Sequence, residues 1–279
     1  MFNSARRWFG TGLHYALVFV VLALASGAWS VAVAQAKPLK PLDVPYVPTP
    51  SDVVALMLEI ANVQSSDYVI DLGSGDGRIA IAAVRDRGAR GAMGVDIDPV
   101  RIGEARKNAK EAGVADKVKF RNQDLFETDF SKASVLTMYL LPNVNLKLRP
   151  KVLDLAPGTR VVSHAFDMGG WESDAHQQVG SYNVYLWIVP AKVDGQWRVS
   201  EPDGDVAVNF KQEFQKVHGT AKKDGQQPVP VAGVLRGNVI RFAVGQGSEA
   251  QQHVGRVQGD YIVAIPEDGS VHGWRASRR

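Results

Sequence analysis

Acidic side chains and glycines follow closely on three short apolar runs in the first half of the chain. The first run, Tyr68-Val-Ile-Asp-Leu72, contains Asp71 and leads directly into Gly73-Ser-Gly-Asp-Gly77. Asp96 ends the second run and Asp124 follows the third. Packing alone does not explain a carboxylate beside a tight glycine turn, because burying an unpaired charge is costly. The pattern therefore predicts a bound ligand that carries a positive charge.

A dinucleotide is the first ligand to compare with this glycine turn. Its G-x-G-x-x-G fingerprint needs a final glycine where this chain has Arg78. A pyrophosphate beside Asp71 would also bring like charges together in a poorly screened crevice. S-adenosylmethionine fits better, because its ammonium suits Asp71 and its carboxylate suits the amides of the turn at a helix N-terminus.

The remaining acids match the remaining donor groups of this cofactor. Asp96 lies 23 residues after Gly73, close to the ~20 expected of a ribose-binding acid. Asp124, after the third run, is assigned to the adenine amine. Each of these two acids has an alternative role as the cap of the helix that follows it.

A parallel sheet would bring these positions together. Apolar β-type runs alternate with helical patterns, and Thr49 is expected to be the N-cap of the first helix, with Pro50 at its first position. This alternation predicts an α/β fold whose ligands bind at the carboxyl ends of the strands. The strands are predicted at 68–72, 91–95, 118–122, 134–139, 159–163 and 182–189, and two further helices at 78–87 and 99–112.

The motifs Asp71-Leu-Gly-Ser-Gly-Asp-Gly77 and Gly94-Val-Asp96 resemble those of class I, seven-stranded, S-adenosylmethionine-dependent methyltransferases. Three further elements look like the mitochondrial lysine methyltransferases that modify the ATP synthase c-subunit and the adenine nucleotide translocase, and their bacterial relatives. They are Pro45-Tyr-Val-Pro-Thr-Pro50, Asp124-Leu-Phe126 and Tyr139-Leu-Leu-Pro-Asn143. The resemblance covers about residues 41–190.

The resemblance implies a Rossmann-like seven-stranded sheet with helices on both faces and S-adenosyl-L-methionine as the cofactor. It implies a protein lysine as the methyl acceptor, with a membrane protein among the candidates, and it makes Tyr139 and Asn143 the catalytic residues lining the methyl-transfer site. The implied cofactor-binding residues are Asp71, Gly73, Gly75, Gly77, Asp96 and Asp124.

Methyl transfer to an amine mainly requires that an uncharged nitrogen be aligned with the methyl group. An apolar slot walled by Tyr139 would favour the neutral amine, because burial lowers the pKa of a lysine side chain. The alternatives are that Tyr139 is a core residue at the end of a buried strand and that Asn143 caps the next helix.

Residues 1–36 are predicted to contact a membrane. Arg6-Arg7 precedes an uncharged stretch over 13–34, and Ala34-Gln-Ala36 suits a signal peptidase. A cleaved signal peptide and a retained anchor fit equally well, and the paired arginines resemble a twin-arginine export signal. The protein is thus expected to be anchored in the membrane or exported to the periplasm, with residues 37–48 as a proline-rich linker between this leader and a methyltransferase domain at 49–190.

Residues 193–279 are predicted to form a small antiparallel β domain whose role the sequence leaves open, with strands at 196–199, 206–214, 231–235, 239–244, 261–265 and 271–274. Large apolar residues favour burial, so five aromatic residues are expected to form its core rather than a ligand platform. They are Trp197, Phe210, Phe214, Phe242 and Trp274.

Composition excludes several kinds of chemistry. The chain of 279 residues has no cysteine, and its six histidines show no metal-ligand spacing, so no metal is expected. His164 is interpreted as a structural histidine. Four of the 32 basic residues lie before position 41, where there is no acid, so the rest of the chain is nearly neutral and nucleic acid is not expected as a partner.

Two other functions remain open at this point. S-adenosylmethionine is not expected outside the cytoplasm, so an exported chain could instead be a non-catalytic periplasmic protein that binds an adenosyl ligand. The methyl acceptor could also be a lipid or a small molecule.

Overall fold

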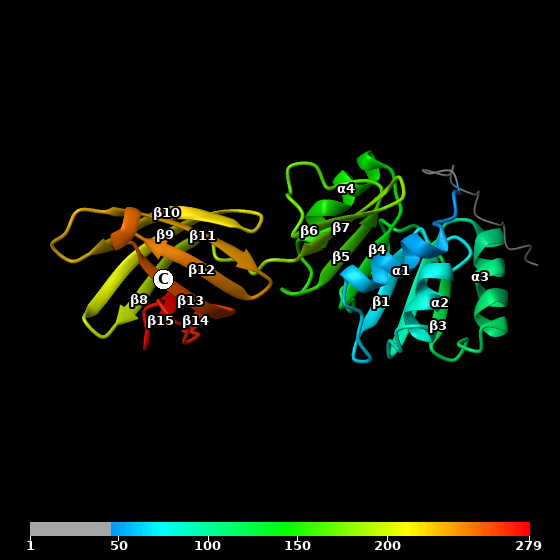
Figure 1. Cartoon of the computed structure of the whole chain (residues 1–279), viewed down its shortest axis with the longest axis horizontal. Helices are drawn as coiled ribbons and strands as arrows, with labels where there is room; N and C mark the ends of the chain where they lie inside the picture. Colours follow the sequence, from blue (N-terminus) through cyan, green and yellow to red (C-terminus); the bar gives the residue numbers. More distant parts are fainter. Residues whose placement is uncertain (1–45) are drawn as a thin grey trace, which may run out of the picture. The chain divides into compact units, whose positions relative to one another are not determined.

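The computed structural model describes residues 46–279, which form a seven-stranded sheet with helices followed by a closed β-barrel (Figure 1). The leader predicted at 1–36 and most of the linker predicted at 37–48 lie outside the described residues. The helices of the first part are α1 (Ser51–Ile60), α2 (Arg78–Arg85), α3 (Pro99–Glu111) and α4 (Pro142–Val152). Its strands are β1 (Tyr68–Leu72), β2 (Gly91–Asp96), β3 (Val118–Asn122), β4 (Val135–Met138), β5 (Arg160–His164), β6 (Ala175–Val179) and β7 (Tyr182–Ile188).

The sheet has the strand order β3-β2-β1-β4-β5-β7-β6. Strands β1 to β5 are parallel, and β7 runs antiparallel to both β5 and β6. The chain leaves β1 for β2 on one side and later places β4 on the other, so the order reverses at β1. Ligands of such sheets bind where the order reverses, at the carboxyl ends of the strands. The predicted α/β class is confirmed.

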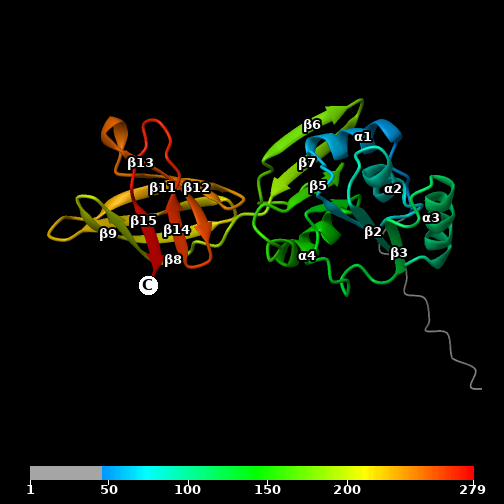
Figure 2. The same ribbon diagram turned by 90° about the horizontal axis from the view of Figure 1, so that it is seen from below.

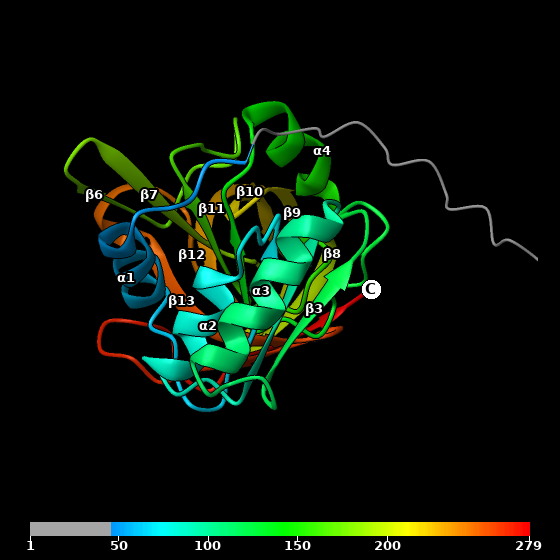
Figure 3. The ribbon, with the colours of Figure 1, turned by 90° about the vertical axis from the view of Figure 1, so that its right-hand side faces the viewer.

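Helices cover both faces of this sheet. Buried side chains of α1, α2 and α3 form one apolar core with one face, and those of α4 form a second core with the other. Figure 2 shows α4 on the side of the sheet opposite α1 and α2, and Figure 3 shows α2 and α3 side by side. Nearly every residue of β1 and β4 is buried, because both faces of these strands are covered.

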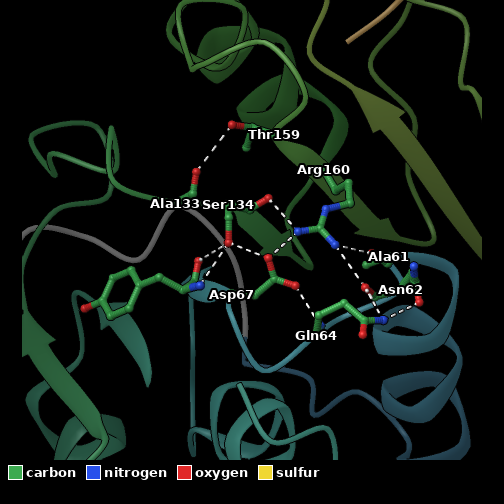
Figure 4. Close-up of polar contacts among 9 residues, drawn as sticks. Ala61, Asn62, Gln64, Asp67, Ala133, Ser134, Thr159 and Arg160 are labelled. Atoms are coloured by element: carbon green, nitrogen blue, oxygen red, sulfur yellow. Dashed lines mark hydrogen bonds and ion pairs between the residues drawn. The ribbon is translucent and has the colours of Figure 1, made fainter. Parts of the chain in front are cut away.

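Hydrogen bonds and an ion pair connect the segments that precede the strands, at the edge of the sheet opposite their carboxyl ends (Figure 4). The Arg160 guanidinium bonds the Asp67 carboxylate and the carbonyls of Ala61 and Asn62, the latter two at 3.0 Å each. Ser134 Oγ donates to Asp67 Oδ1 at 2.8 Å. Burial alone would raise the pKa of Asp67, but its hydrogen bonds, led by the one from Arg160, hold it below the ordinary value.

Substituting Asp67 with asparagine is expected to lower the free energy of unfolding by about 2 kcal/mol, because a hydrogen-bonded buried charge is lost. A carboxyl with a lowered folded pKa stabilises the protein above its ordinary pKa, and the stabilisation is lost as the pH falls through the folded value. Urea unfolding at neutral pH measures the change. The control is Asp86→Asn, which removes an exposed pair with Arg85 and should cost less than about 1 kcal/mol; equal losses would contradict the prediction.

Two features of the sheet differ from the sequence prediction. Strand β6 was not predicted, because Ala-His-Gln-Gln-Val has no apolar alternation; it is an edge strand whose three central residues are exposed. Helix α1 begins at Ser51 with Pro50 as N-cap, so the assignment of Thr49 as the cap is wrong. The hydroxyl of Thr49 instead lies 3.2 Å from Nδ1 of His164.

The second part is a closed barrel of eight antiparallel strands in the order β10-β11-β12-β13-β14-β15-β8-β9. The predicted antiparallel β domain is confirmed. A short 3₁₀ helix, η1 (Gly247–Glu249), lies between β12 and β13. The strands are β8 (Gly195–Glu201), β9 (Gly204–Glu213), β10 (Lys216–Lys223), β11 (Val229–Arg236), β12 (Val239–Val244), β13 (Gln251–Gln258), β14 (Tyr261–Ala264) and β15 (Arg275–Arg278).

The core of the barrel contains four of the five predicted aromatic residues, Trp197, Phe210, Phe242 and Trp274. Phe214 is only half-buried. Strands β10 and β13 were not predicted, because they contain few apolar residues among many polar ones. The predicted strand at 271–274 is wrong: the last strand, β15, starts after Trp274, whose ring fills the core from the preceding loop.

None of the helices within residues 46–279 is long and apolar enough to cross a membrane.

Candidate active site

A cleft of about 190 Å³ lies at the carboxyl ends of β1, β2, β3 and β4, where the acids predicted to bind a ligand come together. Its walls come from the segment before α1, from the turns after these strands and from the segment after β5. The lining residues used below are Tyr46, Thr49, Asp71, Gly73, Gly75, Asp76, Arg78, Asp96, Arg101, Asp124, Tyr139 and Phe166.

The glycine turn after β1 shapes one wall of the cleft. Gly73, Gly75 and Gly77 have φ angles of +74°, +51° and +82°, a region that residues with a side chain rarely adopt. A Cβ atom at Gly75 would lie 2.5 Å from the Tyr46 ring, so this glycine lets another segment close over the turn. Gly73 and Gly75 line the cleft, whereas Gly77 serves as the N-cap of α2.

The amides of this turn bond mainly within the protein. The N–H groups of Gly73 and Ser74 both donate to the Val95 carbonyl at 2.9 Å, and that of Gly75 donates to Asp96 Oδ2 at 2.8 Å. Three of the amides expected to bind the cofactor carboxylate therefore have partners within the protein. The cationic groups that line the cleft are Arg78 and Arg101.

Asp71 is the most constrained acid of the cleft. It is 1% exposed, and its Oδ1 accepts a hydrogen bond of 2.7 Å from the Thr137 hydroxyl of the neighbouring strand β4. Its Oδ2 is buried without a hydrogen-bond partner among the described residues. Burial raises the pKa of Asp71 to about 7, and the nearby carboxylates of Asp96 and Asp76 add to the shift. An unpartnered buried oxygen of this kind suits a cationic ligand group.

Ligand binding through Asp71 is expected to weaken as the pH falls below about 7. A protein acid with a pKa of about 7 is largely protonated at pH ~6, and an ammonium prefers the carboxylate form, so the Kd for S-adenosylhomocysteine should be roughly tenfold higher at pH ~6 than at pH ~7.5. Titration calorimetry in two buffers of different ionisation enthalpy should also detect release of a proton on binding. A Kd that does not change over this range would contradict the assignment.

Asp96 and Asp124 lie at the carboxyl ends of the second and third strands, as predicted. Asp96 is half-buried, and its two oxygens accept from the amides of Gly75 and Asp98 at 2.8 and 2.9 Å, so it ties the glycine turn to the turn after β2. Asp124 Oδ1 accepts from the Phe126 amide at 2.9 Å. Both acids line the cleft, and the alternative that each caps its following helix is wrong: the N-cap of α3 is Asp98, and the chain passes from β3 to β4 without a helix.

The structure separates the two residues predicted to be catalytic. Tyr139 follows β4 and lines the cleft, with its ring centroid 6.4 Å from that of Phe166. Asn143 is exposed in the first turn of α4 and does not line the cleft, because Pro142 starts the helix and the first turn carries the side chain toward solvent. The amide that reaches the turn after β5 is that of Asn145, which donates to the Asp167 carbonyl at 3.2 Å.

The segment that covers the glycine turn belongs to the motif Pro45 to Pro50, but its place in the cleft was not predicted. Tyr46 to Pro48, predicted as linker, line the cleft, and the Arg101 guanidinium lies 4.4 Å from the centroid of the Tyr46 ring. Phe166 and Arg101 were also missed, since neither belongs to the glycine turn or to a motif that marks a strand end. Within residues 46–279, no three His, Asp or Glu side chains come together in a way that could hold a metal ion.

Comparisons with known proteins agree with this geometry. A family model described as the ANTKMT methyltransferase domain matches residues 71–175. A protein-lysine N-methyltransferase of Saccharolobus islandicus (strain REY15A) is 48% identical over 151 residues, which are 52% of this chain and 94% of that protein. The chain belongs to the ANTKMT methyltransferase family.

Other relatives of this ANTKMT-family chain differ in the acceptor their descriptions give. The adenine nucleotide translocase lysine N-methyltransferase of mouse is 34% identical over 53% of this chain and 64% of its own. A crystal structure described as an RNA methyltransferase from Salinibacter ruber, in complex with S-adenosyl-L-homocysteine, is 56% identical with a TM-score of 0.52, over 53% of this chain and 96% of its own. The family model ends at residue 175, before the barrel begins at Gly195.

The ANTKMT-family chain is an S-adenosylmethionine-dependent methyltransferase, and the cleft suits this cofactor. The unpartnered Asp71 Oδ2 matches the ammonium, and Asp96 reaches the cleft at the ribose position of such folds. A Cβ atom at Gly73 would lie 2.8 Å from the Leu140 side chain, and the φ of +74° there also favours glycine. When bound, the cofactor supplies a methyl group on a positively charged sulfur.

Proposed function

We propose that this methyltransferase transfers the methyl group to the side-chain amine of a protein lysine. The observation that carries the proposal is the aromatic wall of the cleft, where Tyr139 and Phe166 face the same space as the buried acid Asp71. Such a wall favours the uncharged amine, because a lysine ammonium loses its hydration on entering it and its pKa falls. The proton leaves to solvent before the amine reaches the methyl group.

The chain's own residues then have two tasks. Asp71 and Asp96 hold the cofactor in one orientation, and the aromatic wall excludes water and guides the amine along the line of the sulfur–methyl bond. The descriptions of the archaeal and mouse relatives, both lysine N-methyltransferases, support this acceptor class.

RNA is the second candidate acceptor, because the Salinibacter structure is described as an RNA methyltransferase. The charge of this chain opposes that reading: apart from the four basic residues before position 41, acidic and basic side chains are nearly equal in number. RNA binding depends on basic surface to neutralise phosphates.

Incubation of the purified full chain with methyl-labelled S-adenosylmethionine separates these candidates. The acceptors are a lysine-rich protein, the same protein with its amines blocked by acetylation, total RNA and protein-free lipid vesicles. We expect label in the unblocked protein alone, and mass spectrometry of its digest should place the methyl groups on lysine. Label in RNA or lipid would replace the proposal, and cofactor binding without transfer to any acceptor would favour a binding protein.

The natural acceptor is proposed to be a membrane protein. The support is twofold: relatives described as lysine N-methyltransferases of the ATP synthase c-subunit and of the adenine nucleotide translocase, and a predicted leader with an uncharged stretch at 13–34. We further propose that the leader places the enzyme at the membrane or in the periplasm. Reporter fusions after Ala36 and after Arg279 would determine the side of the membrane, and methyl-lysine in soluble proteins only would contradict a membrane acceptor.

A further inference from the structure

His164 is a buried polar residue that has no role in cofactor binding and does not belong to the aromatic wall of the cleft. It ends β5, is wholly buried, and its Nδ1 lies 3.2 Å from the hydroxyl of Thr49. Its Nε2 has no partner among the residues described by the structure. Burial lowers the pKa of His164 to about 4, so the ring is neutral near pH ~7. A neutral ring beside the cleft does not repel a cationic cofactor or an incoming amine.

A strained turn directs this ring and the next aromatic side chain to the same place. The Phe166 amide donates to the His164 carbonyl at 2.9 Å, and Ala165 between them has a φ of +67°. A three-residue turn with a positive central φ is rare and strained, and such strain tends to persist at functional sites. The Ala165 amide donates to the Asn183 carbonyl at 2.8 Å, which fixes the turn to β7.

Both rings of this turn lie against Tyr139. The His164 ring centroid is 3.9 Å from that of Tyr139, closer than the 6.4 Å of Phe166. His164 itself does not line the cleft, whereas Tyr139 does. The imidazole therefore reaches the cleft through neighbours that line it, the Tyr139 ring and Thr49.

Thr49 connects this aromatic cluster to the cofactor side of the cleft. Its carbonyl accepts a hydrogen bond of 2.8 Å from the Arg78 guanidinium, which also pairs with Asp76 of the glycine turn. Its hydroxyl faces His164. One residue of the segment before α1 thus contacts both the wall that shapes the cofactor site and the wall that faces the acceptor.

We propose that Thr49 and His164 are positioning residues for methyl transfer: the hydroxyl–imidazole contact fixes the His164 ring, and this ring fixes Tyr139 at the mouth of the acceptor slot. The inference rests on the proposed function. A purely structural role would be served better by an apolar residue, since a buried nitrogen without a partner is destabilising.

The test uses a matched pair of substitutions in the full-length protein. Thr49→Val keeps the volume but removes the hydroxyl, and Thr49→Ser keeps the hydroxyl. We expect Thr49→Val to lower kcat for a lysine acceptor about tenfold while the Kd for S-adenosylhomocysteine stays within about twofold, and Thr49→Ser to restore most of kcat. The control is Thr159→Val, because Thr159 is also buried and loses a hydroxyl bond, to the Ala133 carbonyl, at the opposite edge of the sheet (Figure 4).

An equal loss of kcat in Thr49→Val and Thr159→Val, or a loss that appears only in the Kd of the cofactor product, would overturn the inference. A second readout does not depend on activity: the NMR signals of the Tyr139 ring in the S-adenosylhomocysteine complex should shift in Thr49→Val and stay unchanged in Thr159→Val. Unchanged Tyr139 signals in Thr49→Val overturn the inference whatever the acceptor. If the Tyr139 signals shift in Thr49→Val but the wild-type protein methylates no lysine, the positioning of Tyr139 is supported. In that case the proposed function is wrong and not this inference.

Discussion

Asp71→Asn is expected to weaken binding of S-adenosylmethionine by about 100-fold. The substitution keeps the size of the side chain and removes the negative charge that the buried, unpartnered Oδ2 offers to the cofactor ammonium. Truncating one partner of a buried charge pair typically costs ~2–5 kcal/mol, and ~2.7 kcal/mol corresponds to 100-fold in Kd. Titration calorimetry at pH ~7.5 measures the change.

A matched ligand shows whether the loss is specific. 5′-Methylthioadenosine keeps the adenine and ribose but has no amino-acid portion, so its Kd should be nearly the same for the wild type and Asp71→Asn. If Asp71→Asn weakens the binding of both ligands equally, the substitution has disturbed the cleft. The assignment of Asp71 to the ammonium is then wrong.

The same substitution is expected to stabilise the free protein at neutral and higher pH. The folded pKa of Asp71 is about 7 and its ordinary value is 3.8, so between these pH values the folded state holds a proton that the unfolded chain has lost. The contribution of Asp71 to the free energy of unfolding therefore falls as the pH rises through this window. We expect a higher Tm for ligand-free Asp71→Asn at pH ~8, together with weaker binding of the cofactor. This combination would show that the buried Asp71 carboxylate contributes to ligand binding and not to the stability of the fold.

Gly77→Ala is expected to lower the free energy of unfolding by about 3 kcal/mol and to weaken cofactor binding. The φ of +82° at this position strains any residue with a side chain, at roughly 1–2 kcal/mol. The added Cβ would also lie 2.7 Å from Cε1 of the Phe120 ring and 3.0 Å from Ala105, and such overpacking costs roughly 1–3 kcal/mol. Because Gly77 is the N-cap of α2, the resulting shift moves the glycine turn.

Gly88→Ala separates the two causes. Gly88 has a similar φ of +70°, but a Cβ there would meet nothing within 4 Å. Its loss should be close to the backbone cost alone, about 1 kcal/mol, with no change in cofactor affinity. Urea unfolding and calorimetry on both variants provide the comparison, and equal losses would show that the contacts of Gly77 with Phe120 and Ala105 are unimportant.

The parts of the site that the sequence revealed are local in the chain. Asp71 lies near the end of β1, just before the glycine turn, Asp96 ends β2, and Asp124 comes two residues after β3. Their positions follow once a parallel sheet is accepted. Tyr139, which follows β4, was instead named through the resemblance of the motif Tyr139 to Asn143 to the lysine methyltransferases. These predictions needed no knowledge of which segments meet across the fold.

The missed parts depend on contacts between distant segments. Tyr46 covers Gly75, and Thr49 meets a histidine 115 residues further along the chain. The local pattern Thr-Pro-Ser-Asp suggested a helix cap for Thr49, and the tertiary contact with His164 prevailed. Asn143 was misplaced for a related reason: the motif located the right turn, but helical geometry carries Asn143 outward and Asn145 inward.

The contacts of Arg160 and Asp67 stabilise the sheet far from the cleft, and this separation bears on how the family acquires different methyl acceptors. Those contacts lie at the edge of the sheet remote from the cleft, so exchange of side chains that face the acceptor leaves them in place. Relatives that share about half of their sequence with this chain carry descriptions with different acceptors, protein lysine and RNA. Contacts that stabilise the fold lie at one edge of the sheet, and the residues that select the acceptor lie at the opposite edge. A new acceptor specificity can therefore arise without loss of the stabilising contacts.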